Sequence, residues 1–134
     1  MSKAIINPWQ WQDKIGFVQG IKITKPQQWM ICAGQTAMNE LGEPQYANDI
    51  LKQINLALDN LEVVLAGAGM LLKDVVRLSY YTTDLNAFHQ ASDSLKTRLE
   101  NSQCYATATL LEVKSLAFPE LMVEFEATAV LTEA

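Results

Sequence analysis

The C-terminal residues 121–130 alternate between apolar and polar positions, which predicts a strand with one buried face. The apolar positions are Leu121, Val123, Phe125, Ala127 and Ala129. Glu124 and Glu126 fall between them, so both carboxylates point away from the face that carries the apolar set. This local pair of acids is the first place in the chain where chemistry is expected.

Apolar residues at spacings of three and four predict two amphipathic helices. The first covers about 47–68 and carries the stripe Ile50, Ile54, Leu58, Leu61, Leu65 and Ala68. Asn48 and Asp49 are both suited to cap its start, and Gly69 suits a left-handed stop. The second helix is expected after a cap at Asn86, with the stripe Phe88, Ala91, Leu95 and Leu99.

Six segments have the composition of strands, namely 15–19, 21–24, 28–33, 74–83, 104–116 and 121–131. Gly20, Pro26 and the Phe118-Pro119 pair act as turn formers between them, and 34–45 is a long loop. The order is three strands, helix, strand, helix and two strands, which indicates an α+β fold. Two helices with one apolar stripe each cover a single face of the sheet. Assembly with copies of the same chain is the economical cover for the other face.

A chain of 134 residues, 49% of them hydrophobic, is sized for one domain spanning 1–134. Its apolar runs are shorter than the roughly 20 residues of a membrane span, and its first residues lack the layout of a signal peptide. We therefore expect a cytoplasmic protein that makes no membrane contact. Cys32 and Cys104 are far apart and outside any CxxC arrangement, which favours free, buried thiols.

The net charge and the histidine content bear on which partners and which kinds of site are expected. The net charge is −5 and the ten basic residues are scattered singly, which argues against nucleic acid as a partner. His89 is the single histidine, so neither a zinc site rich in histidine nor a histidine triad can be built without it. We expect no metal and no cofactor.

Several short motifs resemble, in order, those of the RidA/YjgF family, also labelled the endoribonuclease L-PSP family. They are IGFVQG at 15–20, AGQ at 33–35, LDNL at 58–61, AG at 68–69, DVV at 74–76, DLN at 84–86 and VEFEA at 123–127. The resemblance covers nearly the whole chain. It implies a chorismate-mutase-like α+β fold, with a six-stranded mixed sheet and two helices on one face. It also implies a homotrimer with a central barrel and ligand pockets in clefts between subunits.

The resemblance also implies enamine or imine deamination by an arginine in a Pro-Ala-Arg stretch, which clamps the substrate carboxylate. Counting back from Glu112-Val113, the arginine position falls on Ala108. Other pocket positions differ as well: Phe17 stands for a tyrosine, Ala33 for a serine and Ser92 for an asparagine, whereas Gly34 and Glu124 match. Most of the polar groups that would orient an imine and its water are therefore replaced, and Glu124 is the one candidate catalytic residue.

A ligand site is still expected around these positions. Glu124 would be its single inward-facing charge, with a raised pKa, in one cavity with Ala108 at the border of a second subunit. The backbone of Gly34 would approach the ligand, with Ala33, Ser92 and an apolar wall of Phe17, Trp9 and Trp11 around it. Two alternatives stay open: Glu124 as a solvated or interface-paired carboxylate, and the aromatic residues as core or interface packing. Arg77 alternates onto the face away from the helices with Ser79 and Tyr81, which favours an ion pair between subunits over a substitute clamp.

Three functions follow from these observations. The first is a trimer that binds a small metabolite in the cleft between subunits, without ordinary 2-aminoacrylate imine deaminase activity. The second is a divergent enamine or imine deaminase, or another hydrolase, in which Glu124 positions water. The third is a regulator of the endoribonuclease or translation-inhibitor type, against which the acidic charge balance weighs.

Overall fold

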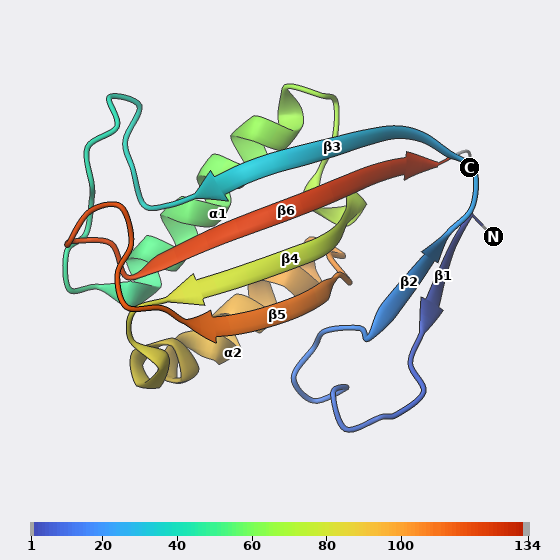
Figure 1. Ribbon diagram of the computed structural model, residues 1–134, viewed down its shortest axis with the longest axis horizontal. Helices are drawn as coiled ribbons and strands as arrows, with labels where there is room; N and C mark the ends of the chain where they lie inside the picture. The colour runs from blue at the N-terminus through green and yellow to red at the C-terminus, as the bar shows by residue number, and fades with distance from the viewer. Residues whose placement is uncertain (1, 133–134) are drawn as a thin grey trace.

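The computed structural model describes residues 2–132 as a four-stranded sheet with two helices on one face and a small separate pair of strands (Figure 1). The elements in chain order are β1 (Lys3–Ile6), β2 (Gly20–Ile23), β3 (Pro26–Gln35), α1 (Ile50–Ala66), η1 (Leu72–Asp74), β4 (Val75–Thr82), α2 (Leu85–Asn101), β5 (Thr107–Glu112) and β6 (Val123–Thr132). The α+β class with both helices on one face is confirmed. In the part of the chain that the structure describes, neither helix is long and apolar enough to cross a membrane.

The main sheet is mixed and has the strand order β3-β6-β4-β5. β6 runs antiparallel to both of its neighbours, β3 and β4. β4 and β5 run parallel, and α2 makes the crossover that a parallel pair requires. β6 is therefore an interior strand, with β3 on one side and β4 on the other.

The hydrophobic core lies between the helices and the sheet. Its helical members include Ile54, Leu58, Leu61 and Leu65 of α1 and Phe88, Ala91 and Leu95 of α2. On the sheet side they meet Leu78, Val123, Phe125, Ala127 and Ala129. These are the helical stripes and the alternating strand positions that the sequence predicts, so the periodicity located the core correctly.

The opposite face of the sheet is left uncovered by this chain. On β3, Trp29 is 62% exposed and Ile31 is 82% exposed, and Leu111 on β5 is 52% exposed. Figure 1 shows that both helices lie on the other side of the sheet. The predicted one-sided cover is confirmed, and exposed apolar side chains on the uncovered face remain without a partner inside the chain, beside polar residues such as Tyr81 and Glu126.

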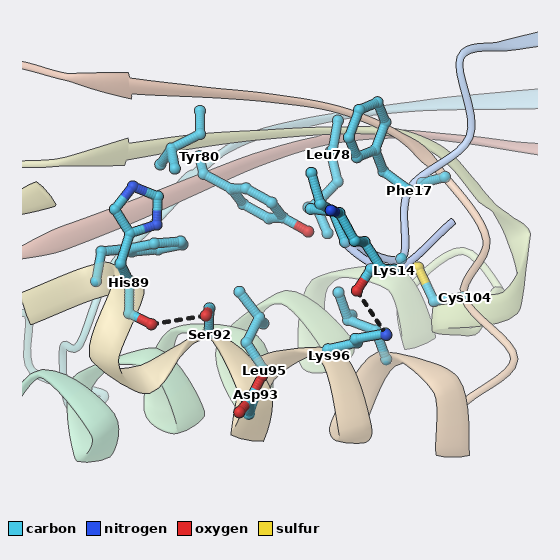
Figure 2. A pocket seen from close by; sticks show the side chains of 17 residues that line it. Lys14, Phe17, Leu78, Tyr80, His89, Ser92, Asp93, Leu95, Lys96 and Cys104 are labelled. Atoms are coloured by element: carbon cyan, nitrogen blue, oxygen red, sulfur yellow. Dashed lines mark hydrogen bonds between the residues drawn. The ribbon is translucent and has the colours of Figure 1, made fainter. Parts of the chain in front are cut away.

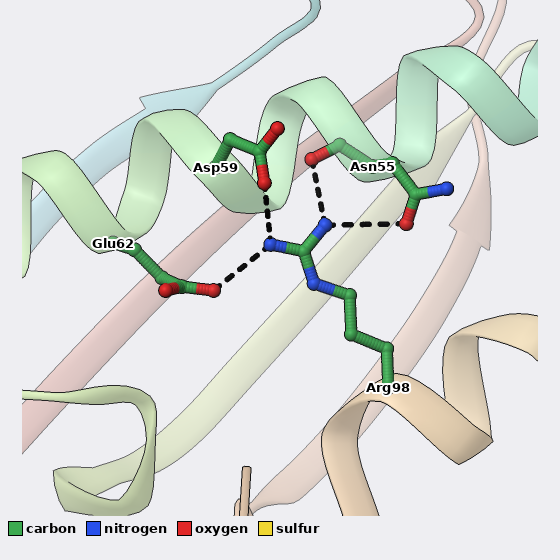
Figure 3. A network of polar contacts seen from close by, with 4 residues as sticks. All are labelled: Asn55, Asp59, Glu62 and Arg98. Carbon is green, nitrogen blue, oxygen red and sulfur yellow. Dashed lines mark hydrogen bonds and ion pairs between the residues drawn. The ribbon is translucent and has the colours of Figure 1, made fainter. Parts of the chain in front are cut away.

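The two helices are also joined at the surface by Arg98 of α2 (Figure 3). Its Nη2 atom lies 2.6 Å from Asp59 Oδ1 and 2.8 Å from Glu62 Oε1, both on α1. Nη1 donates to the carbonyl oxygen of Asn55 at 2.8 Å and contacts its Oδ1 atom at 3.2 Å. Because a planar guanidinium can serve several acceptors at once, one side chain fixes α2 against α1.

The strand predicted at 15–19 is wrong, and the strands do not form one six-stranded sheet. Ile15 and Gly16 both donate backbone hydrogen bonds to the carbonyl of Gln12, and Gly16 has φ +99°, so this stretch is turned rather than extended. Only Val18 forms an isolated bridge, to Thr107 of β5. β1, a short run without clear alternation that the sequence analysis missed, pairs with β2 as a second sheet instead.

The helix ends show which capping predictions hold. Asp49 caps α1 by accepting from the backbone N–H of Lys52 at 3.1 Å, and Gly69 adopts the expected left-handed conformation with φ +70°. The cap predicted at Asn86 is wrong. Asp84 accepts from the N–H of Ala87 at 3.0 Å, so α2 begins before Asn86, which lies in its first turn. The other predicted strands are present with shifted ends.

Candidate functional site

A pocket of about 480 Å³ lies between α2, strands β4 and β5, and the turned segment 14–17 (Figure 2). Its inner wall consists mainly of apolar side chains: Leu78, Phe88, Leu95, Leu99, Ala106 and Leu110. This arrangement arises because the Val18–Thr107 bridge holds the preceding turn against the edge strand β5, over the gap between β5 and α2. A concave, mostly apolar hollow of this size suits a small organic molecule.

Polar side chains gather where the pocket meets solvent. Lys14, His89 and Asp93 are exposed, and Lys96 donates to the backbone carbonyl of Lys14 at 2.7 Å. This hydrogen bond ties segment 14–17 to α2. Ser92 donates its hydroxyl hydrogen to the carbonyl of His89 at 2.7 Å, so this hydroxyl is already used within its own helix.

Three of the predicted site residues line this pocket: Phe17, Ser92 and Ala108. Ala108 lies opposite Leu78, which is buried in the core, and therefore faces the helices. The methyl group of Ala108 leaves the pocket without a guanidinium at the position where the resemblance implies one. Phe17 likewise contributes a ring without a hydroxyl group.

Three more of the predicted residues, Ala33, Gly34 and Glu124, lie on the opposite face of the sheet. Glu124 is next to Phe125 on β6, and since Phe125 faces the helices, Glu124 faces away from them. Ala33 is exposed on β3, and Gly34 lies within this strand rather than in the loop predicted at 34–45. The Glu124 side chain lies directly against Gly34, where an added β-carbon would be 2.6 Å from Glu124 Cδ.

Within a single chain, Glu124 and Ala108 do not share a cavity, and the predicted cavity at the border of a second subunit stays a prediction. The sheet separates them because their side chains point to opposite faces: Ala108 of β5 aligns with Leu78 of β4, whereas Glu124 of β6 aligns with Tyr81 of β4. The sequence gives the residue identities, but the register of the strands decides which face of the sheet each side chain occupies.

Burial raises the pKa of Glu124, and the nearby carboxylate of Glu126 raises it further. The predicted direction of this shift is confirmed. Glu126 is held by the Tyr81 hydroxyl, which donates to its Oε1 atom at 3.0 Å. This hydrogen bond is the main cause of a raised pKa for Tyr81. Within residues 2–132, no side chain is found to hydrogen-bond Glu124, so it is the acid of the pair that remains available to a ligand or a neighbouring subunit.

The tryptophans do not line the pocket of the single chain, and their place in a wall between subunits stays a prediction. Trp9 and Trp11 are 63% and 58% exposed, and neither lines the pocket beneath α2. Trp11 packs edge-on against Phe17, with 5.9 Å between the ring centroids. The alternative of packing thus describes Trp11 better, and Phe17 alone of the three aromatic residues reaches the pocket.

A second hollow, of about 330 Å³, lies at the same strand edge and is bordered by Phe17, Val18, Gln19, Arg77, Thr107, Ala108 and Thr109. Arg77 and Thr107 are register partners on β4 and β5. Arg77 is exposed and forms no ion pair in the part of the chain that the structure describes. The prediction that it faces away from the helices is confirmed, because it shares β4 with the alternating core residue Leu78.

The sequence analysis missed two residues inside the pocket, Tyr80 and Cys104. Alternation along β4 placed Arg77, Ser79 and Tyr81 on one face, so the same pattern assigns Tyr80 to the helical side. Both cysteines are free and buried, as predicted. Burial raises the pKa of Cys104 to about 12, which keeps it a protonated, unreactive thiol.

Comparison with known proteins agrees with this architecture. The family model described as Endoribonuclease L-PSP matches residues 12–131. TdcF of Escherichia coli (strain K12), whose name gives a provisional role as a reactive intermediate deaminase, is 29% identical over 83 residues. That match covers 61% of this chain and 64% of TdcF, slightly under two thirds of the relative.

Solved structures extend the likeness to nearly the full chain. The crystal structure of YyfB from Yersinia pestis, a Rid-family protein of unknown function, has a TM-score of 0.84 and 32% identity, covering 98% of this chain and 100% of YyfB. The structure of Escherichia coli TdcF with bound serine has a TM-score of 0.71 and 26% identity, covering 87% of this chain and 88% of TdcF. With a family model that matches almost every element and a fold shared with these proteins, the chain belongs to the RidA/YjgF (endoribonuclease L-PSP) family.

Proposed function

We propose that this protein is a cytoplasmic homotrimer of one RidA-like domain that binds a small, largely apolar metabolite between subunits, without ordinary 2-aminoacrylate imine deaminase activity. The observation that carries this proposal is the pocket beneath α2, which has Ala108 where a clamping arginine is implied. An enclosed apolar wall with few polar groups favours a neutral ligand, because burying an unpaired carboxylate is costly.

The division of the site residues supports the trimer. Phe17, Ser92 and Ala108 lie at one edge of the sheet, and Gly34 and Glu124 lie on its uncovered face. A ligand that touches both groups needs them to come from different copies of the chain. The exposed apolar side chains of that face, including Ile31 at 82%, supply a surface for such an interface.

The nearby lysines do not replace the missing arginine. The Nζ atom of Lys96 donates a hydrogen bond to the carbonyl oxygen of Lys14 and lies 3.8 Å from Oε1 of Glu100. Lys14 lies in the solvent-exposed part of the rim. An ammonium group in either position also lacks the planar fork that holds a carboxylate by two parallel hydrogen bonds.

Native mass spectrometry of the protein as isolated tests the proposal directly. We expect a trimeric mass, with a neutral small molecule released on denaturation, and no acceleration of 2-aminoacrylate hydrolysis in an assay coupled to its generation. A monomer, or an assay rate like that of arginine-bearing relatives, would contradict it.

A divergent deaminase or hydrolase is the second candidate, and one observation favours it. Glu124 has a raised pKa and no hydrogen-bond partner among residues 2–132, which are properties of a carboxyl group that can exchange a proton with water. TdcF, to which the chain is similar, is named for deaminase activity. In this alternative Arg77, beside Thr107 in the second hollow, would supply the cation. Loss of measured turnover in both Glu124→Gln and Arg77→Ala would support it.

A further inference from the structure

The most informative polar group in the pocket beneath α2 is the hydroxyl of Tyr80. Figure 2 shows the Tyr80 ring extending from β4 across the pocket, with its oxygen directed into the space between the sheet and α2. No residue from 2–132 is found to hydrogen-bond this hydroxyl. Tyr80 is half-buried and its hydroxyl faces the open pocket, so a ligand that fills the pocket must supply an acceptor or leave this donor unpaired.

The direction of the hydroxyl is fixed by the packing of its ring. The Tyr80 ring lies 5.3 Å from that of Phe125, at 70° between planes, and 5.8 Å from that of Phe88, at 39°. Phe125 is fully buried in the sheet and Phe88 belongs to α2, so the ring is held from both layers of the fold. A ligand would thus meet a donor that is already oriented.

The surroundings of the hydroxyl keep it protonated. Burial raises the pKa of Tyr80, and the neighbouring Cys104 raises it further. Leu78, Leu95 and Ala108 are among the apolar side chains around the same space. Tyr80 is therefore a neutral donor in an apolar wall at any ordinary pH.

The geometry points to Tyr80 as the residue that orients the ligand, by donating a hydrogen bond to a neutral acceptor, such as a ketone oxygen, on an otherwise apolar molecule. The inference rests on the proposed function, because it concerns the same pocket, and it adds the chemical class of the ligand. A neutral acceptor takes the hydrogen bond of the hydroxyl, while the rest of the ligand fills the apolar part of the pocket. A hydrocarbon of the same shape fills the space but leaves the hydroxyl unpaired.

Two probes of nearly the same shape separate these effects: acetophenone, which has a carbonyl acceptor, and α-methylstyrene, which has a methylene group in its place. Each is titrated into the native protein and followed by the amide NMR signals of Phe17, Ser92 and Ala108. The variant Tyr80→Phe removes the hydroxyl and keeps the ring contacts. Tyr81→Phe is the matched control, since it removes a hydroxyl from the same strand on the opposite face, where it bonds Glu126.

We expect acetophenone to bind the native protein about five- to tenfold more tightly than α-methylstyrene, the ratio that one net hydrogen bond provides. Tyr80→Phe should reduce this ratio to near one, and Tyr81→Phe should leave it unchanged. Equal binding of both probes by the native protein, or a preference that survives in Tyr80→Phe, overturns the role of Tyr80 and leaves the pocket intact. Failure of both probes to shift the three amides overturns the pocket itself, and with it the proposed function.

Discussion

The side chain of Glu124 occupies the space directly above the α-carbon of Gly34, on the uncovered face of the sheet. A β-carbon at residue 34 would lie 2.6 Å from Glu124 Cδ and 2.9 Å from its Cγ, closer than such atoms approach in proteins. The glycine therefore leaves room for this position of the carboxylate and does not serve an unusual backbone angle. β3 and β6 pair around this contact, so the two residues form one structural unit.

Replacing Gly34 with alanine should displace Glu124 without unfolding the protein. The atoms in conflict are near the end of a flexible side chain, so we expect the free energy of unfolding to change by less than about 1 kcal/mol. The displaced carboxyl should become more hydrated, and its pKa should fall toward the usual value. NMR titration of the Glu124 carboxyl measures this. Gly20→Ala, where the new β-carbon makes ordinary contacts from 3.6 Å, is the control and should leave the titration unchanged.

The Glu124 pKa also predicts a dependence of stability on pH. The pKa of Glu124 in the folded protein is raised above its ordinary value of 4.5. The unfolded chain therefore holds fewer protons than the folded one between these two pKa values, and stability falls as pH rises through them. Glu124→Gln removes this loss and should stabilise the protein near pH 7. The gain should disappear at a pH below the ordinary pKa of a glutamate. Urea unfolding at the two pH values tests this, with the exposed Glu40→Gln as control. A variant less stable than native at neutral pH would show that Glu124 forms a favourable ion pair in the assembly.

The uncovered face should hold the subunits together. Light scattering is expected to give three times the chain mass of 14.9 kDa. Ile31→Lys places a charge on that face and should shift the protein toward smaller species or prevent folding. Val63→Lys is the matched control, because Val63 is 72% exposed on α1, outside the sheet. A monomeric native protein, or dissociation caused equally by both variants, would remove the sheet face as the interface.

Restoring a guanidinium should restore binding of a carboxylate only from the correct face. Ala108→Arg directs it toward the pocket beneath α2, where a bidentate pair is worth about 1.5 to 3 kcal/mol, or tenfold and more in affinity. Thr107→Arg directs it to the opposite face, beside Arg77. We expect 2-aminoacrylate turnover to appear, if weakly, in Ala108→Arg and to remain absent in Thr107→Arg. The reverse result would locate the productive cleft on the other side of β5.

Arg98 should contribute to stability through the contact between the helices. Arg98→Ala loses hydrogen bonds to Asn55, Asp59 and Glu62 and should lower the free energy of unfolding by about 1 to 3 kcal/mol. Arg98→Lys keeps the charge but cannot reach all three residues at once, so its loss should be intermediate. Chemical denaturation of the two variants measures both values. Equal stability of Arg98→Ala and the native protein would show that solvent screening cancels the network.

Short-range patterns in the sequence determined most of the architecture. The alternation around Phe125 and the helical stripes around Leu58 and Leu95 located the buried faces correctly, because burial on one side imposes a period of two on a strand and of about 3.6 on a helix. Because each helix has one apolar stripe, the same pattern also predicted that both helices cover one face of the sheet. The cap of α2 was assigned to Asn86 instead of Asp84, because both side chains accept the same kind of hydrogen bond and the pattern does not mark which of them the helix uses.

Tertiary structure decided which residues meet. Residues 15–19 have the composition of a strand, but the left-handed Gly16 and the hydrogen bonds to Gln12 turn them into a cover for the pocket. The sequence shows which residues stand at positions 108 and 124. That Ala108 and Glu124 point to opposite faces of the sheet follows only from the pairing of β5 and β6 with β4. Tyr80 became a candidate only when α2 and segment 14–17 enclosed its hydroxyl. Local sequence thus fixes the period of each element, and the register between distant strands, set by packing of the whole core, fixes the chemistry of the site.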